Sequence, residues 1–242
     1  MRLISIENFD KIFKPLIGLK VGVVDGPGNV GDILLQLSTR QLLDIYQINH
    51  QTVNPLAEII RPEKFDKLLL FGGGNMGYAP AQVIRRAAVS TGIPCVVLPQ
   101  TVILFEEQQF EEVFLREPTS LSLSPRGQLA PDLALGFDFP EDLPKPHIDH
   151  GLFLRRYGHA KFSGIAADPA EICNTPEEYW KLARLYKSIT TDRLHFAICA
   201  IAMGCNVTLL PVDYHKNKSM WEYCLKPLGC GWSDDLQKLL EE

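Results

Sequence analysis

The feature that most constrains the fold is an unbroken apolar run over residues 196–203. Apolar side chains occupy every face of a helix drawn through this run, so we expect a helix that is buried on all sides. Thr191 and Asp192 are favourable N-cap residues, and Gly204 stands where such a helix would end. Residues 206–210 then have the pattern of a strand. The stretch therefore predicts one helix and one strand of a parallel α/β layer.

Polar residues stand at the start of this helix and after this strand. Arg193 and His195 lie beside the free N–H groups of the first helical turn, an arrangement suited to an anion. In a parallel layer the carboxyl end of the strand returns to the edge where the helix begins. That edge would also receive Asp213, His215, Lys216 and Lys218. The alternative is a capped helix with a surface ion pair and a solvated basic turn.

The first part of the chain alternates predicted strands with predicted helices. The expected strands are 19–25, 48–53, 67–71, 93–98 and 112–115, and the expected helices are 33–46 and 79–90. This order predicts a parallel, doubly wound sheet. Polar residues follow several of these strands, and parallel sheets bind ligands at the carboxyl ends of their strands.

Two glycine-rich segments follow predicted strands. Gly26, Gly28 and Gly31 satisfy the G-x-G-x-x-G pattern of dinucleotide sites, but no acidic residue ends the 48–53 strand, where a ribose would be held. A tight turn with Asn29 and Asp32 as turn and cap residues is the alternative. The consecutive glycines at 72–74 indicate a backbone that something approaches closely.

Proline positions divide the chain into two parts. Pro140, Pro144 and Pro146 mark residues 137–150 as a linker between an N-terminal lobe, 1–136, and a small C-terminal lobe, 151–242. Within the small lobe we expect a short strand over 151–156, a helix over 176–187, and terminal helices over 221–225 and 234–240.

Composition excludes several classes of protein. The chain has 242 residues, a net charge of −5 and no basic run with interleaved aromatic residues, so nucleic acid is not an expected partner. No apolar run reaches the roughly 18 residues needed to span a bilayer, and the first 20 residues are unlike a signal peptide. The six cysteines form no C-x-x-C pair, which favours reduced thiols in a cytoplasmic protein. No histidine, cysteine or carboxylate spacing indicates a metal site.

Seven segments, taken in order, resemble the polysaccharide pyruvyl transferase family. They are Gly28-Asn29-Val30-Gly31-Asp32, the glycines at 72–74, Leu98-Pro99-Gln100-Thr101, Phe114-Leu115-Arg116-Glu117 with Ser120, Pro131-Asp132-Leu133-Ala134, Thr191-Asp192-Arg193-Leu194-His195, and Tyr214-His215-Lys216. The resemblance implies an α/β fold of two Rossmann-like lobes with parallel sheets, similar to GT-B glycosyltransferases, here with a reduced second lobe. It also implies transfer of pyruvate from phosphoenolpyruvate to a sugar, as a cyclic ketal, on an exopolysaccharide, capsule or cell-wall glycan precursor.

The resemblance also assigns roles to individual residues. Arg116 matches the family's arginine that follows the strand expected here over 112–115. Arg193, Leu194 and His195 match its Arg-x-His at a helix start. These four, with Lys216, are the expected donor-binding residues. Guanidinium groups suit a donor that carries both a carboxylate and a phosphate.

Proton transfers give the remaining candidates. His195 is the candidate general acid and Asp32 the candidate base for a sugar hydroxyl, while Lys216 would neutralise the departing phosphate. The expected acceptor or loop contacts are Asn29, Gly73, Gly74, Asn75 and Gln100. A basic cluster of Arg155, Arg156 and His159 could contact the donor or an acceptor phosphate, but a solvated face is the preferred interpretation.

The reaction needs phosphoenolpyruvate as co-substrate but no cofactor or metal. The glycan acceptor could be lipid-linked, in which case the enzyme would work at the inner face of the cytoplasmic membrane. The stretch between Gly151 and Ser188 departs from the family pattern, so acceptor recognition is the less defined part.

Three other functions remain open at this stage. A GT-B-like glycosyltransferase that uses a nucleotide sugar would share the architecture. A non-catalytic component of a polysaccharide assembly complex would not need two arginines and an imidazole at an anion site. A nicotinamide-dependent enzyme rests on the glycine pattern alone.

Overall fold

The chain forms two compact units, each with its own parallel β-sheet. The computed structural model describes residues 1–104, 106, 109–141, 145–162 and 166–237, and of Asn75 it describes the backbone alone. The N-terminal unit consists of residues 4–28 and 35–137. The C-terminal unit consists of residues 1–3, 29–34 and 138–242. The first turn of the long helix α2 (Val30–Ile45) thus belongs to the C-terminal unit and the rest of α2 to the N-terminal unit.

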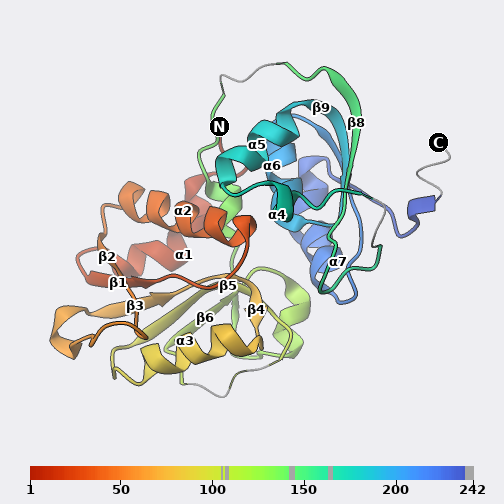
Figure 1. Ribbon diagram of the computed structural model, residues 1–242. Helices are drawn as coiled ribbons and strands as arrows, with labels where there is room; N and C mark the ends of the chain where they lie inside the picture. The colour runs from red at the N-terminus through yellow and green to blue at the C-terminus, as the bar shows by residue number, and fades with distance from the viewer. Residues whose placement is uncertain (105, 107–108, 142–144, 163–165, 238–242) are drawn as a thin grey trace. The chain divides into compact units, whose positions relative to one another are not determined.

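The N-terminal unit is a doubly wound parallel sheet in the order β2-β1-β3-β5-β6-β7, with β4 paired to β5. Its strands are β1 (Lys20–Val24), β2 (Asn49–Val53), β3 (Lys67–Leu70), β4 (Gly73–Met76), β5 (Cys95–Val102), β6 (Glu112–Leu115) and β7 (Gln128–Leu129). Besides α2, its helices are α1 (Asp10–Phe13), α3 (Ala79–Val89) and the short turns η1 (Ile6–Phe9), η2 (Lys14–Leu16), η3 (Pro62–Lys64), η4 (Pro118–Ser122) and η5 (Leu133–Gly136). Figure 1 shows α1 and α3 on opposite faces of this sheet.

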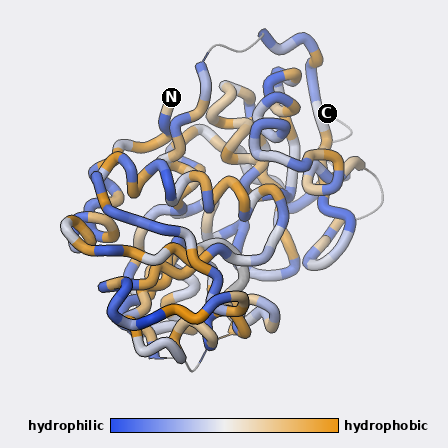
Figure 2. The backbone as a smooth tube through the Cα atoms, turned by 60° about the vertical axis from the view of Figure 1, so that its left-hand side comes forward, coloured by the Kyte–Doolittle hydropathy of each residue, from blue (hydrophilic) through white to orange (hydrophobic). Residues whose placement is uncertain are grey.

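Burial explains why the central strands of this sheet are so apolar. All eight residues of β5 are buried, because helices cover both faces of the sheet. Gly22 in β1 is required by close packing, since a Cβ atom at this position would lie 2.5 Å from Cδ2 of Leu68. The distribution of hydrophobic and hydrophilic residues along the chain can be followed in Figure 2.

The close approach expected at the glycines 72–74 is made by a neighbouring strand: a Cβ atom on Gly72 would lie 2.7 Å from the carbonyl oxygen of Pro99, and Gly73 and Gly74 begin strand β4, which pairs with β5. One expectation for this unit was wrong in detail. The strand expected at 93–98 extends through the Pro99-Gln100-Thr101 segment to Val102, since β4 and β6 continue to supply pairing partners there.

The C-terminal unit contains a four-stranded parallel sheet in the order β11-β10-β9-β8. Its strands are β8 (Ile148–Phe153), β9 (Tyr186–Thr191), β10 (Asn206–Leu209) and β11 (Gly231–Trp232). Its helices are α4 (Pro169–Ile172), α5 (Pro176–Arg184), α6 (Leu194–Ala202), α7 (Lys216–Met220), η6 (Trp221–Leu225) and η7 (Lys226–Leu228). Helices α5 and α6 pack together along the central strands β9 and β10.

Helix α6 confirms the prediction of a helix buried on all sides, because seven of its nine residues are buried. Its expected N-caps were wrong. Arg193 occupies the N-cap position, while the hydroxyl of Thr191 accepts the Arg193 N–H and the carboxylate of Asp192 accepts the Arg155 N–H. The reason is strand β9, which was not expected and which carries the chain directly into the helix through Thr191.

The boundaries of the C-terminal unit also differ from the sequence prediction. The chain passes from one unit to the other between Phe137 and Asp138. The linker expected over 137–150 ends earlier, because β8 begins at Ile148, and residues 142–144 of it lie outside the described part of the chain. The expected helix over 221–225 is present, whereas that over 234–240 lies partly outside the described residues.

The expected fold class, α/β with two Rossmann-like lobes and a reduced second lobe, is confirmed by the two parallel sheets. Within the described residues, no helix combines the length and the apolar character that crossing a bilayer requires.

Candidate functional site

Polar side chains from several segments meet at the carboxyl edge of the four-stranded sheet in the C-terminal unit. Strand β8 leads into Arg155, strand β9 into Asp192 and Arg193, and strand β10 into the loop before Lys216. Asp192 interacts electrostatically with all three of these cationic groups. The structure therefore brings together the two segments that the sequence placed at one edge.

Arg193 is held by a two-point ion pair with Asp168. Its Nε donates to Oδ1 at 2.9 Å and its Nη2 donates to Oδ2 at 2.5 Å. Asp168 is 1% exposed and also accepts the backbone N–H groups of Arg156 and Ala170. Burial alone would raise the pKa of Asp168, but the Arg193 hydrogen bond and the other donors outweigh it and lower the pKa below its ordinary value. Burial likewise acts to lower the pKa of Arg193, and Asp168 more than offsets it.

Asp192 is fully buried and only half satisfied. Its Oδ1 accepts the Arg155 N–H at 2.8 Å, while its Oδ2 lies 3.9 Å from Nε of Arg155. Within the described part of the chain, neither Oδ2 of Asp192 nor Nε of Arg155 has a hydrogen-bond partner. Burial raises the pKa of Asp192 despite the nearby N–H and cations. Burial, followed by the charge of Arg193, lowers the pKa of Arg155.

Helix α7 lies beside the carboxyl ends of β9 and β10. The amide of Asn217 donates to the carbonyl oxygens of Asp192 and Leu210, both at 2.8 Å, and so ties the helix to the β9 and β10 ends. Lys216 is 7% exposed, and its Nζ lies 5.4 Å from the centre of the Tyr214 ring. Lys218, by contrast, is 45% exposed and pairs with Glu222, so it does not join the cluster.

His195 stands in the first turn of α6, against the first turn of α2. A Cβ atom on Gly31 would lie 2.5 Å from Nδ1 of His195, so a larger residue would force the helix turn or the imidazole to move. At this helix start, Oδ1 of Asn29 accepts the Gly31 N–H and Oδ2 of Asp32 accepts the Asn29 N–H, each at 2.9 Å. The capping role for Asn29 and Asp32 is thus confirmed, and the capped turn lies beside His195.

Arg116 lies in the N-terminal unit and is engaged there by other side chains. It is 1% exposed, its Nε donates to the Thr101 hydroxyl at 2.9 Å, and its Nη1 donates to Oδ2 of Asp132 at 2.8 Å. Asp132 is itself fully buried and caps η5 through Ala134. The structure holds Arg116 in an internal ion pair, so its expected role in donor binding stays a prediction.

The other predicted contact residues of the N-terminal unit lie within its β-strands. Gln100 is fully buried in β5, and its amide donates to the Phe71 carbonyl at 2.7 Å. Gly73 and Gly74 belong to β4, and the side chain of Asn75 lies outside the described residues. The assignment of these residues to the acceptor stays a prediction.

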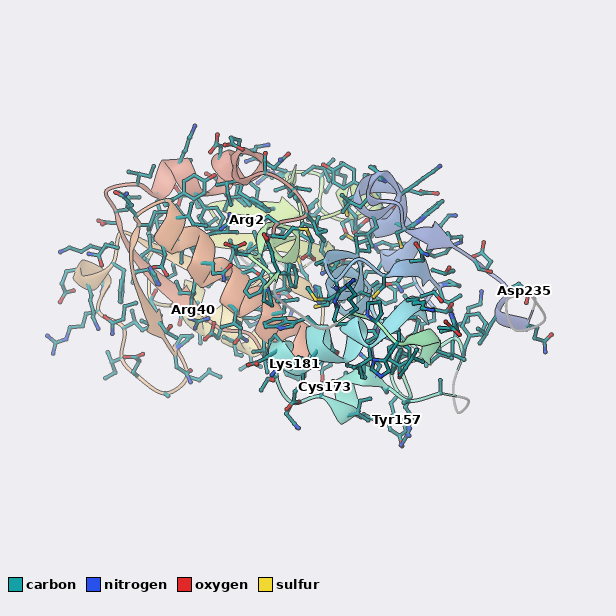
Figure 3. The ribbon with its side chains drawn as sticks, turned by 90° about the horizontal axis from the view of Figure 1, so that it is seen from above. Arg2, Arg40, Tyr157, Cys173, Lys181 and Asp235 are labelled. Atoms are coloured by element: carbon teal, nitrogen blue, oxygen red, sulfur yellow. The ribbon has the colours of Figure 1, made fainter. Side chains whose placement is uncertain are left out.

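Sequence reasoning missed Asp168 and Asn217 and misassigned Arg155. The basic cluster of Arg155, Arg156 and His159 is not a uniform solvated face: Arg155 is 8% exposed, while Arg156 and His159 are exposed. The next residue, Tyr157, is also exposed and lies at the surface (Figure 3). The signal in the sequence was the position of Arg155 two residues after the buried Phe153, since alternate residues of a strand face the same side.

No group of three or more histidine, cysteine or carboxylate side chains is positioned for a metal ion within the part of the chain that the structure describes. The described residues at this edge place guanidinium, ammonium and imidazole groups beside the N-terminus of α6, an arrangement suited to an anion.

Comparisons with known proteins identify the family. A crystal structure of a functionally uncharacterized protein from Klebsiella pneumoniae subsp. pneumoniae NTUH-K2044 matches with a TM-score of 0.75 and 19% identity, over 95% of this chain and 98% of that chain. MnaA of S. aureus, in a structure with UDP, matches with a TM-score of 0.44 and 12% identity, over 80% of this chain and 79% of that chain. No curated protein matches. The model of one family, polysaccharide pyruvyl transferase, matches residues 29–214, which is most of the chain and includes Arg155, Arg193 and His195, while Lys216 lies two residues beyond the match; the protein belongs to the polysaccharide pyruvyl transferase family.

Proposed function

We propose that this protein transfers pyruvate from phosphoenolpyruvate to a sugar of an exopolysaccharide, capsule or cell-wall glycan precursor, as a cyclic ketal. The observation that carries the proposal is the convergence of Arg155, Arg193, His195 and Lys216 at the carboxyl edge of one sheet. The family match supports the class of activity, and the chemistry of this cluster supports an anionic donor.

The cluster suits the charges of phosphoenolpyruvate. The donor carries a carboxylate and a phosphate, and planar guanidinium groups bind both kinds of oxyanion through paired hydrogen bonds. Arg193 uses Nε and Nη2 for Asp168, which fixes the plane of its guanidinium and leaves Nη1 outside this ion pair. The N-terminus of the nine-residue helix α6 adds the positive end of the helix dipole.

The proposed reaction balances without an oxidant or reductant. C3 of the donor gains a proton, one sugar hydroxyl forms a bond to C2, and the C2–O bond to phosphate breaks. A second hydroxyl then closes the ketal on C2. The two hydroxyl groups release two protons, of which one is matched by the proton gained at C3 and the other leaves on inorganic phosphate.

His195 is the group we assign to proton donation, since an imidazole exchanges protons near neutral pH and this one stands beside the helix N-terminus. Asp32 is in the first turn of α2 and is partly exposed, although its Oδ2 already accepts the Asn29 N–H. We assign Asp32 to a sugar hydroxyl as acceptor of a hydrogen bond or a proton. Lys216 supplies positive charge for the departing phosphate.

The acceptor is proposed only by its chemical class, a glycan precursor. A glycan precursor, including a lipid-linked one, would bring a cytoplasmic enzyme to the inner face of the membrane without a spanning segment. The proposal needs no cofactor or metal other than the co-substrate itself.

Thermal unfolding with phosphoenolpyruvate tests the proposal directly. A ligand at about 100 times its dissociation constant stabilises the native state by about 2.7 kcal/mol, which gives a clear rise in the unfolding midpoint. We expect this rise for the wild type and a much smaller one for His195→Gln, with Lys218→Gln as the control because Lys218 lies outside the cluster. A rise produced by UDP-sugars but not by phosphoenolpyruvate would contradict the proposal and favour a glycosyltransferase.

A further inference from the structure

The Nε donor of Arg155 is buried without the hydrogen bond that normally accompanies such burial. The side chain is 10% exposed, and Nε has no hydrogen-bond partner among the residues that the structure describes. A buried donor that has left water without gaining a protein acceptor is destabilising, and more so when the group is charged. The folded chain therefore maintains an unfavourable arrangement at this position.

The nearest carboxylate does not relieve this cost. Oδ2 of Asp192 lies 3.9 Å from Nε of Arg155, beyond hydrogen-bonding distance, and Oδ2 itself has no hydrogen-bond partner within the described part of the chain. Oδ1 of Asp192 accepts the backbone N–H of Arg155, which fixes the residue but leaves its Nε without a hydrogen bond. Nε of Arg155 and Oδ2 of Asp192 are close enough to attract each other electrostatically but too far apart to form a hydrogen bond.

Arg155 also lies near other cationic groups. Asp192 interacts electrostatically with Arg155, Arg193 and Lys216, and Arg193 has Asp168 as a two-point partner. After burial, the charge of Arg193 is the largest cause that lowers the pKa of Arg155. A bound anion would accept a hydrogen bond from Nε of Arg155 and offset the repulsion between the two guanidinium groups.

We propose that Arg155 is an anion-binding residue of the donor site, which binds an oxyanion of phosphoenolpyruvate, its phosphate or its carboxylate, through the guanidinium. This inference rests on the proposed function for the identity of the ligand. It replaces the solvated face expected for this segment with a second arginine that contacts substrate. The exposed neighbour Arg156, whose Nη1 lies 3.3 Å from Glu171, takes no part in binding.

Calorimetric titration of wild type, Arg155→Gln and Arg156→Gln with phosphoenolpyruvate, inorganic phosphate and pyruvate tests this assignment. One charge-assisted hydrogen-bonded contact corresponds to a roughly ten- to hundredfold change in dissociation constant. We expect that loss for phosphoenolpyruvate in Arg155→Gln and wild-type binding in Arg156→Gln. Loss of phosphate binding assigns the phosphate to Arg155, and loss of pyruvate binding assigns the carboxylate.

The outcomes separate this inference from the proposed function. Phosphoenolpyruvate binding that is equal in wild type and Arg155→Gln would overturn the assignment of Arg155 and leave the proposed function in place. Phosphate binding that depends on Arg155, with no binding of phosphoenolpyruvate to the wild type, would support an anion site and overturn the proposed function. If Arg155→Gln does not fold, Arg155→Lys keeps the charge and loses the planar fork, and unchanged affinity in that variant would overturn the assignment.

Discussion

Two buried arginines, one in each unit, stand after parallel strands and differ in how they are satisfied. Arg116 follows β6 in the N-terminal unit and bonds to the Thr101 hydroxyl and to the Asp132 carboxylate. Arg155 follows β8 in the C-terminal unit by two residues, and its Nε has no bonded partner among the described residues. Both side chains are at least nine-tenths buried.

This difference shows that its position at the end of a strand does not decide whether an arginine is available to bind a ligand. A parallel sheet brings polar residues to its carboxyl edge, but the partners supplied by the rest of the unit determine what remains available. Asp132 stands 16 residues after Arg116 and reaches its guanidinium at 2.8 Å. Asp192 reaches only the backbone of Arg155 at bonding distance. Arg116 uses Nε and Nη1 for partners in its own unit, whereas Nε of Arg155 has no such partner among the described residues.

The largest expected effect is on the stability of Arg116→Gln. Removing one partner of a buried ion pair leaves the other charge uncompensated and costs about 3 to 5 kcal/mol. The matched substitution Arg155→Gln should lower the free energy of unfolding by much less, about 1 kcal/mol, because the guanidinium that is lost had an unsatisfied donor. Urea denaturation of both variants measures the two values. Equal losses would remove the distinction drawn between the two arginines.

A somewhat smaller loss is expected for Asp168→Asn, which removes the carboxylate paired with Arg193. The cost should be about 3 kcal/mol at neutral pH, at the low end for a buried pair because Arg193 is 15% exposed. The folded-state pKa of Asp168 is lowered, so its contribution is fully present above the ordinary carboxyl pKa of about 4 and is lost as pH falls through the lower, folded value.

Denaturation of wild type and Asp168→Asn across a pH series checks the sign. The difference between the two should be constant from pH 5 to 7 and should shrink below pH 4. A difference that instead grows as the solution becomes acidic would show that Asp168 is not held as a carboxylate by Arg193.

Periodicity predicted most of the fold, and its failures have local causes. The apolar run over 196–203 and the strand at 20–24 were recognised because burial on all sides leaves only one pattern. Strand β9 was missed because Lys187 and Ser188 interrupt its apolar character and because β9 follows α5 after a single residue, Leu185. Strand β4 was missed because two of its four residues are glycine. Glycine has a low propensity for strands, so the sequence alone did not predict a strand here, although a paired strand can contain it.

The candidate site was predicted in outline but not in its partners. The sequence placed Arg193, His195 and Lys216 at one edge because parallel topology alone requires it. Asp168 was not found, since its pairing with Arg193 spans 25 residues of chain and no periodic pattern marks the segment before it. For Arg155, the adjacent Arg156 and exposed Tyr157 favoured a solvated cluster, and burial differs sharply between neighbours at the end of a strand.

Substitution of Gly31 by alanine tests how closely the backbone at this position packs against the imidazole of His195. An alanine Cβ would lie 2.5 Å from Nδ1 of the imidazole, so the loop or the ring must move. Overpacking of this kind costs about 1 to 3 kcal/mol, and a displacement of a catalytic group by about 1 Å can reduce activity about 100-fold. Denaturation of Gly31→Ala, His195→Ala and the double variant measures the coupling. The double variant should recover most of the stability lost in Gly31→Ala, and additive losses would mean that the two residues do not meet.

The smallest effect is expected where an arginine of the N-terminal unit is paired near the surface. Nη2 of Arg40 lies 2.5 Å from Oδ2 of Asp25, at the end of β1, and also donates to the Thr52 hydroxyl. The two charged side chains are 29% and 32% exposed, so water can solvate whichever charge is left after a substitution. Arg40, labelled in Figure 3, thus has a short ion pair without the burial of Arg116. Arg40→Gln should therefore lower the free energy of unfolding by at most about 1 kcal/mol. The same urea experiment decides the matter: a loss as large as that of Arg116→Gln would show that contact distance, rather than exclusion of water, sets the strength of these pairs.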